Sequence, residues 1–392
     1  MIISTITTLI TGILLVVFRK TICSFCHIGF GMLLLIVLYS LFYAALDIWY
    51  TRARYEHRYI SYTFVSVSIA FISTIISVVC VIFFSEKAGY NLGIIKVISQ
   101  NVVIIAGAMV AYVHIIFRGK AFFDKKQCRR IIAISWPLVF HSLSKNVLDI
   151  SDRLMIAYIC GDSDAGIYGT LAGFSVIVVI IWNSIDVSIV PSIFAALEID
   201  DYDTTKEICE NALYVFMYVT IISVVLMPLF ARLMTVKEYF DGLFIIPILL
   251  LSNFFLAIYH IFGALLLYRK KTILIMVGTI ISAVINIVLN VLMLKNYGYA
   301  FAAVTTVIAF ASQAMLQGIL CYREYGRTII NVRKVLFMTV VCVVLCTIGA
   351  YLKYNDALRF LILIAPFIMT VKVKDIIIKI LNFLMKNIKI KK

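Results

Sequence analysis

The sequence has few charged residues and few helix breakers. Only 14 % of its 392 residues are Asp, Glu, Lys or Arg, and it holds five prolines and 18 glycines. Soluble globular chains carry about 25 % charged residues, so this composition excludes a soluble enzyme, a disordered protein and a coiled coil. The proline and glycine content also excludes collagen-like and linker-like chains. Hydrophobic residues make up 63 % of the chain and the mean hydropathy is +1.06, which predicts an integral membrane protein with many spans.

The sequence also lacks the motifs of common catalytic and ATP-driven sites. It contains no nucleotide-binding P-loop and no H-E-x-x-H string, and no local signature of a nucleophilic catalyst. We therefore expect no enzyme, no metal and no cofactor. The formal net charge of +15 is interpreted as a membrane feature and not as a nucleic-acid-binding surface, because the chain has little polar surface to carry one.

The nine cysteines do not indicate a disulfide framework, because their number is odd and most lie inside apolar runs. One string, Cys23-Ser-Phe-Cys26-His27, matches the C-x-x-C-H pattern of haem attachment. A single short string is weak evidence, so a chance match in a short loop is the preferred interpretation.

Twelve apolar runs are long enough to be spanning helices, each of which needs about 20 residues. Strands of a transmembrane barrel would be about 10 residues long with alternating polarity, so the fold class predicted is an all-α membrane bundle. The predicted spans are Ile2–Phe18, Ile28–Leu46, Ile60–Phe84, Val97–Phe117, Ile131–Ile159, Ala165–Leu197, Asn211–Met234, Phe244–Tyr268, Thr272–Leu294, Ala300–Cys321, Val335–Leu352 and Leu358–Val373.

Most of the 35 Lys and Arg residues fall on one side of this topology. Cytoplasmic loops carry an excess of Lys and Arg, so this side is predicted to be cytoplasmic. Both termini then lie inside, and residues 374–392 form a basic cytoplasmic tail.

The span Ile131–Ile159 carries a polar stripe. Charged residues inside a span cost about 2.5–3.5 kcal/mol each. At about 100° per residue, the seven polar side chains of the stripe share roughly a third of the helix surface. The stripe is therefore expected to face protein or an aqueous cavity and not lipid. Its members are His141, Ser142, Lys145, Asn146, Asp149, Asp152 and Arg153.

Two interpretations of the stripe remain open. Lys145–Asp149 and Asp149–Arg153 are spaced i,i+4 and can neutralise one another. Buried ion pairs are not intrinsically more stable than apolar packing, so a binding surface for a charged substrate is the favoured alternative.

Further polar residues recur on other spans. Alone, each is typical of an interhelical hydrogen bond, but together they predict helices that contribute polar faces to one central cavity. These residues are Asn183, Asp186, Asn286, Asn290, Gln313 and Gln317.

Three stretches resemble the polysaccharide repeat-unit flippases, the O-antigen transporter family of the MATE-like superfamily. The first runs from Ser135-Trp-Pro137 through His141-Ser-Leu-Ser144 to Ser151-Asp152-Arg153. The second is Gly161-Asp162-Ser163 with Ala165-Gly166-Ile167-Tyr168. The third runs from Arg269-Lys-Lys271 through Asn286-Ile-Val-Leu289-Asn290 to Tyr297-Gly298 and Ala302-Ala303. The likeness covers roughly residues 131–325 well and the first four spans by position only.

The resemblance implies a two-lobed bundle around a central cavity. It further implies alternating access that carries a polyprenyl-diphosphate-linked oligosaccharide (an O-antigen, capsule or exopolysaccharide repeat unit) across the cytoplasmic membrane of a bacterium, with a polysaccharide polymerase as a candidate partner. Lys145 and Arg153 would bind the diphosphate, and the Asn, Gln and His141 side chains would bind the sugar. Asp149, Asp152 and Asp186 are the candidates for coupling this movement to a proton or Na⁺ gradient.

The resemblance also implies a division of the chain. Residues 1–130 form an N-terminal lobe of four helices, 131–325 a C-terminal lobe of six, and 326–373 an extra terminal pair. The family places six helices in the first lobe, so two are expected to be missing from this lobe or to lie upstream. The alternatives are a MATE-type ion-coupled small-molecule exporter, a membrane polysaccharide polymerase and an inactive truncated relative.

Overall fold

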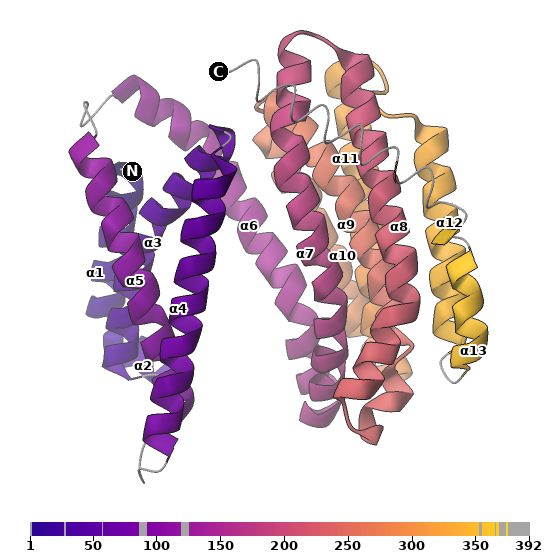
Figure 1. The fold of residues 1–392 in the computed structure, drawn as a ribbon, viewed down its shortest axis with the longest axis horizontal. Helices are drawn as coiled ribbons and strands as arrows, with labels where there is room; N and C mark the ends of the chain where they lie inside the picture. The colour runs from indigo at the N-terminus through magenta and orange to yellow at the C-terminus, as the bar shows by residue number, and fades with distance from the viewer. Residues whose placement is uncertain are drawn as a thin grey trace. The chain divides into compact units, whose positions relative to one another are not determined.

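The computed structural model describes residues 2–26, 29–56, 58–85, 92–118, 125–352, 355–364, 366–367 and 374. No strand occurs among these residues, so the fold is all-α, as predicted. The elements labelled in Figure 1 are α1 (Ile2–Val17), α2 (Arg19–Cys26), α3 (Phe30–Tyr55), α4 (Tyr59–Ser85), α5 (Leu92–Arg118), α6 (Lys125–Ile159), α7 (Asp162–Glu198), α8 (Tyr202–Met234), α9 (Ile245–Tyr268), α10 (Thr272–Tyr297), α11 (Phe301–Tyr325), α12 (Val332–Tyr351) and α13 (Asp356–Arg359), with short 3₁₀ turns at Lys237–Gly242 and Phe360–Leu363.

Within the described part of the chain, the ten helices from α3 to α12 are long and apolar enough to cross a membrane. They correspond to ten of the twelve predicted spans, usually with an extra turn at one or both ends. The predicted span Ile2–Phe18 is the shorter helix α1, of 16 residues. Of the predicted span Leu358–Val373, residues 358–364 and 366–367 are described, and they include the end of α13 and the 3₁₀ turn Phe360–Leu363. The rest of this span, the predicted basic tail beyond residue 374 and His27 of the haem-like string lie outside the described residues.

Helix ends follow from local chemistry. Asp201 caps α8 by accepting hydrogen bonds from the hydroxyl and the amide of Thr204, at 2.6 and 2.9 Å, and these bonds hold the pKa of Asp201 below its usual range. Asn331 caps α12 in the same way, accepting from the amides of Arg333 and Lys334. Helix α11 ends at Gly326, whose φ of 66° is left-handed and therefore favours glycine.

The chain divides into two compact units, Met1–Ile131 and Ile132–Lys392. In the first unit α5 packs against α3 and α4, and α1 packs against α3. The buried apolar core of this unit is small and centres on Leu46, Ala108 and Ala111. Its other apolar side chains are mostly exposed, as expected where lipid is the solvent.

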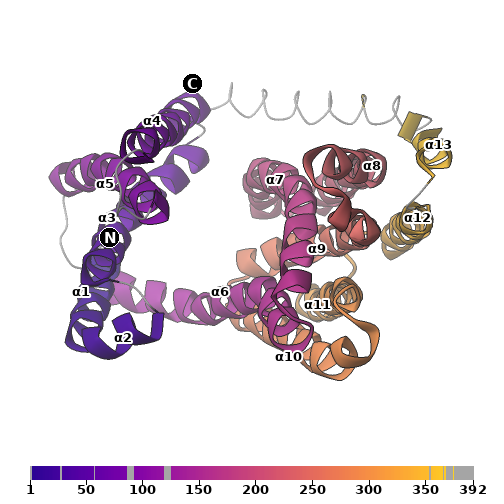
Figure 2. The ribbon, with the colours of Figure 1, turned by 90° about the horizontal axis from the view of Figure 1, so that it is seen from below.

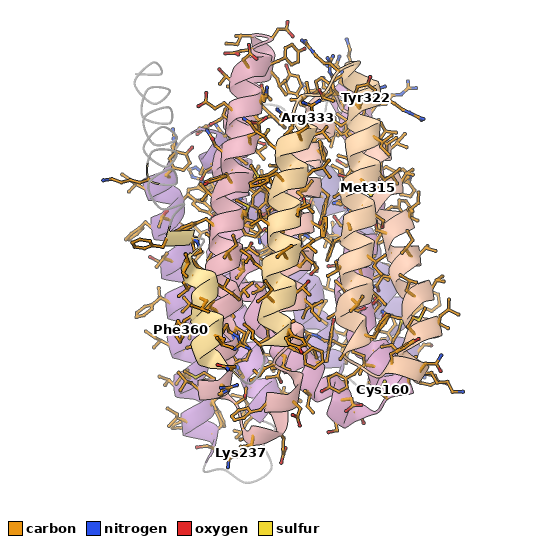
Figure 3. All side chains as sticks on the ribbon, turned by 90° about the vertical axis from the view of Figure 1, so that its right-hand side faces the viewer. Cys160, Lys237, Met315, Tyr322, Arg333 and Phe360 are labelled. Carbon is orange, nitrogen blue, oxygen red and sulfur yellow. The ribbon has the colours of Figure 1, made fainter. Side chains whose placement is uncertain are left out.

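The second unit is built around α9. This helix contacts α7, α8, α11 and α12, and Figure 2 shows it enclosed among its neighbours. Its sequence has no Asp, Glu, Lys or Arg, and most of its side chains are buried, so it forms the apolar axis of the unit. Helix α12 lies beside α11, whose Met315 and Tyr322 are labelled in Figure 3. The polar residues predicted to be functional lie on α6, α7, α10 and α11.

Candidate functional site

Asp152 of α6 is the centre of a buried polar network in the second unit. Its side chain is only 5 % exposed. The carboxylate accepts hydrogen bonds from Asn290 Nδ2 at 2.6 Å, the Thr306 hydroxyl at 2.5 Å and the Tyr168 hydroxyl at 3.1 Å. Three donors converging on one carboxylate suit its ionised form, which only accepts hydrogen bonds. Four helices, α6, α7, α10 and α11, are joined through this one side chain.

The network continues along α10. Asn290 accepts from Thr305 at 2.5 Å and donates to the Asn286 side-chain oxygen at 3.2 Å. Asn286 also accepts from Ser151 at 3.2 Å. Asn286 and Asn290 are fully buried and lie on one helix face because they are four residues apart. The Asn286 Nδ2 group has no hydrogen-bond partner among the described residues.

A second polar group lies on α6, α10 and α11. Thr279 lies 2.6 Å from His141 Nδ1 and accepts a hydrogen bond from Gln313 Nε2 at 2.9 Å. Gln317, one turn further along α11, is fully buried, and neither polar atom of its amide is bonded to a described residue. Because burying an unpaired amide is costly, such a residue is unexpected on stability grounds alone.

A third group joins α7 to α9. Trp182 Nε1 donates to His260 Nδ1 at 3.0 Å, and His260 Nε2 lies 3.1 Å from the Tyr259 hydroxyl. Because Nδ1 accepts the indole proton, the imidazole is neutral, with its own proton on Nε2. Asp186 lies 3.9 Å from His260 Nδ1 and makes no hydrogen bond to a described residue. The hydrogen bond between Trp182 and His260 holds α7 against α9, and the half-buried carboxylate of Asp186 lies beside it.

The remaining predicted residues have more open positions. Lys145 is half-buried, while Asn146, Arg153 and Asn183 are exposed. No ion pair joins Lys145 or Arg153 to a side chain that the structure describes. The side chain of Asp149 lies outside the described residues, so the predicted pairs of Asp149 with Lys145 and Arg153 stay predictions.

Several members of these networks were missed in the sequence. Thr279, Thr305 and Thr306 do not stand out there, because Thr in an apolar helix commonly bonds a carbonyl in the preceding turn. Tyr168 was noted only as part of a stretch that carries the resemblance, and its role in the network was missed. The adjacent pair Thr305-Thr306 and the spacing of seven residues from Thr279 to Asn286 were the available signals. The structure adds the decisive fact that these hydroxyls face Asp152, Asn290 and His141.

The chemistry of the Asp152 network suits a proton or a small hard cation. Its atoms are carboxylate, amide and hydroxyl oxygens, which are the ligands that hard cations prefer. Asp152 pairs with no Lys, Arg or His among the described residues, so its charge can be neutralised by a bound ion. No group of three or more His, Cys, Asp or Glu side chains that could hold a metal occurs in the described part of the chain.

The fold is similar to that of a solved lipid transporter. The structure entitled "Lipid II flippase MurJ, inward closed conformation" superposes with a TM-score of 0.55 over 96 % of this chain and 82 % of that chain, at 16 % sequence identity. At this identity the match shows a shared fold. Comparison with curated proteins gives no match.

A protein-family model supplies the sequence relationship. The model described as "Polysaccharide biosynthesis protein" matches residues 1–198, which extend from α1 to the end of α7 and include the polar stripe of α6. The match covers the first two of the three stretches that carry the resemblance. Because this model matches half of the chain, the protein belongs to the polysaccharide biosynthesis protein family.

Proposed function

We propose that this protein translocates a lipid-diphosphate-linked oligosaccharide across a membrane. The observation that carries the proposal is the buried network of hydrogen bonds to the Asp152 carboxylate. This network lies in a membrane protein whose fold and family are associated with polysaccharide synthesis. A polar network of this kind inside spanning helices is expensive to maintain, and transport gives it a use. The protein acts as a transporter and not as an enzyme.

The headgroup of such a substrate is anionic at the diphosphate and hydroxyl-rich at the sugar. Lys145 and Arg153 supply cations for the diphosphate, and neither is paired with a described side chain. The exposed amides of Asn146 and Asn183 supply donors and acceptors for sugar hydroxyls. In this assignment the sugar first contacts the exposed amides. The more deeply buried residues hold the surrounding helices in place; these are Asn286, Asn290, Gln313 and Gln317.

Asp152 is our candidate for the coupling group. Protonation of Asp152 removes one acceptor position and adds an O–H donor, so it changes the hydrogen bonds that the carboxyl group makes with Asn290, Thr306 and Tyr168. Neutralising Asp152 therefore changes the bonds among α6, α7, α10 and α11 together. Such a two-state polar network is the kind of element through which an ion gradient biases a conformational change.

The finer assignment is a bacterial polysaccharide repeat unit, such as an O-antigen, capsule or exopolysaccharide unit. The protein would lie in the cytoplasmic membrane with both termini inside, beside a polysaccharide polymerase. The positive-inside pattern of the loops supports this orientation.

Genetic complementation tests the proposed function. A strain that lacks its own repeat-unit flippase is expected to regain surface polymer with the wild-type protein. The Lys145→Gln/Arg153→Gln variant is expected to fail, whereas Lys270→Gln/Arg323→Gln, which removes the same charge elsewhere, succeeds. If the Lys145→Gln/Arg153→Gln variant also restores surface polymer, these two residues are not required for binding the diphosphate. Altered drug resistance without polymer export in any of several flippase-deficient strains would favour a small-molecule exporter.

A further inference from the structure

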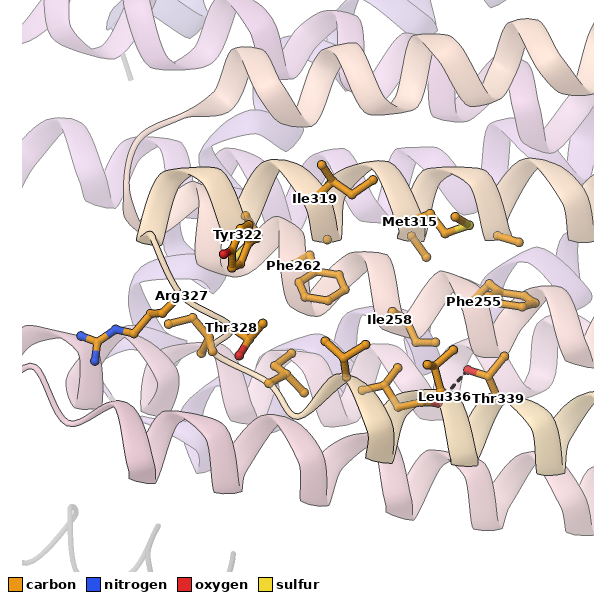
Figure 4. A pocket seen from close by; sticks show the side chains of 18 residues that line it. Phe255, Ile258, Phe262, Met315, Ile319, Tyr322, Arg327, Thr328, Leu336 and Thr339 are labelled. Atoms are coloured by element: carbon orange, nitrogen blue, oxygen red, sulfur yellow. Dashed lines mark hydrogen bonds between the residues drawn. The ribbon is translucent and has the colours of Figure 1, made fainter.

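An apolar groove runs along the second unit between α11 and α12. Its volume is about 520 Å³, and its floor is formed by α9. Figure 4 shows Phe255, Ile258, Phe262 and Leu336 between the two helices, where they line the groove. The Thr339 hydroxyl, which also lines the groove, is bonded to the Val335 carbonyl, so the groove wall offers hydrocarbon and almost no polar group.

The groove has the depth of one membrane leaflet. Its lining on α11 extends from Ala311 to Tyr322, which is about 16 Å at about 1.5 Å rise per residue. Half of the hydrocarbon core of a bilayer is about 15 Å. The groove therefore matches the length of lipid chains that start at one membrane surface and end near the midplane.

A polar pocket adjoins the surface end of the groove. This second pocket has a volume of about 380 Å³ and shares Thr328, Ile330 and Val332 with the groove. Its cationic side chains are Lys206 of α8 and Arg333 of α12. Neither forms an ion pair with any side chain in the described part of the chain.

The other basic groups nearby are already engaged. Lys334 donates to Glu210 at 2.5 Å, and Glu210 also accepts from the Asn331 amide at 3.0 Å. The Arg327 guanidinium lies 3.5 Å from the centroid of the Tyr202 ring. These contacts fix the start of α12 against α8 and leave Lys206 and Arg333 as the cations available to a ligand.

We propose that the groove and the adjoining pocket together bind one glycerophospholipid with an anionic headgroup, which is not the transported substrate. The acyl chains fill the groove between α11 and α12, and Lys206 and Arg333 bind the phosphate-bearing head. The occupant is an amphiphile because an apolar groove of one-leaflet depth joins directly to a basic pocket. The bound lipid fills the space between α12 and α11 and so supports the packing of α12.

Native mass spectrometry of the purified protein tests this site. The wild type is titrated with phosphatidylglycerol or phosphatidylethanolamine. It is expected to bind one phosphatidylglycerol about thirtyfold more tightly than phosphatidylethanolamine, as two near-surface cations would give. The Lys206→Gln/Arg333→Gln variant is expected to lose this preference. The matched control Lys270→Gln/Arg323→Gln removes two basic residues at the same end of the unit, outside both pockets, and is expected to keep it.

A second pair of variants separates the groove from the headgroup pocket. Thr339→Trp fills the groove and is expected to abolish binding of both lipids, whereas Val340→Trp, on the exposed face of the same helix, is expected to leave binding unchanged. Equal binding by wild type and Thr339→Trp would overturn the proposal. Displacement of phosphatidylglycerol by polyprenyl phosphate would also overturn it, because the groove would then bind the lipid of the proposed substrate. A dimer of the protein that binds no lipid would overturn it as well, because a second copy would then cover the groove. Because no step of this measurement involves transport, its failure would leave the proposed function untouched.

Discussion

At the scale of the residue, Asp152 carries the largest share of the functional argument. An ionised carboxylate inside spanning helices is costly unless it is bonded, and Asp152 accepts three hydrogen bonds from three other helices. In the sequence, Asp152 is one member of the stripe on α6 and one of three candidates for ion coupling. Its burial and its partners distinguish it from Lys145, Asn146 and Arg153, which are more exposed.

The substitution Asp152→Asn tests the coupling role. Asparagine has the same shape but no charge to be neutralised by a proton or Na⁺, so transport is expected to fall by about tenfold or more, within the usual range of coupling free energies. The protein should still fold, because the amide can accept from Thr306 or Tyr168. Polymer export and thermal unfolding are the measurements. Asp203→Asn, at an exposed position in the first turn of α8, is the control.

The hydroxyl of Thr306 gives a finer test of the same network. Thr306→Val keeps the shape and removes a hydrogen bond to a carboxylate, which is worth about 1.5–3 kcal/mol. A lower thermal stability and a lower transport rate are expected. Thr306→Ser restores the hydroxyl and should recover most of both. If valine and serine behave alike, the hydroxyl has no role and only the packing of this position matters.

At the scale of the element, close helix packing depends on particular glycines. A Cβ placed on Gly349 of α12 would lie 2.3 Å from Cγ1 of Val224 on α8, closer than two carbon atoms can approach without a shift. A Cβ on Gly173 of α7 would meet no other atom within 4 Å. The two glycines are therefore a matched pair for testing the packing of α12 on α8.

Gly349→Ala is expected to destabilise the protein by about 1–3 kcal/mol through overpacking. Gly173→Ala is expected to be neutral or to stabilise by up to about 1 kcal/mol, since alanine favours the helix. Thermal unfolding in one detergent measures both. An equal response of the two variants would contradict the close approach of α8 and α12.

Much of the helical fold was predictable, and most of the hydrogen-bond network was not. The apolar runs in α3 to α12 are as long as a bilayer-spanning helix requires, so composition alone finds these helices. Hydropathy does not report which hydroxyls meet, so Thr279, Thr305 and Thr306 were missed. It also could not distinguish Gln317, which is buried without a described partner, from Asn183, which is exposed. Those distinctions depend on how α6, α7, α10 and α11 are rotated about their axes.

At the scale of the whole molecule, the orientation of the chain can be tested independently of transport. Green fluorescent protein fused after Lys392 is expected to fluoresce and alkaline phosphatase fused there to be inactive, because the positive-inside pattern places this end in the cytoplasm. The same fusions after Gly161, in the short connection between α6 and α7, should give the opposite result. A reversed pair of signals would show that the proposed orientation is wrong.

The most direct test of the central claim is translocation in vesicles that contain only the purified protein and a labelled substrate. Proteoliposomes are loaded with a fluorescent polyprenyl-diphosphate disaccharide in both leaflets, and a membrane-impermeant reductant quenches the outer label. Under an imposed proton or Na⁺ gradient, the wild-type protein should move label from the inner to the outer leaflet, where the reductant quenches it. The Asp152→Asn variant should do so at least about tenfold more slowly. Protection that stays the same as in protein-free vesicles under both gradients would contradict the proposed function.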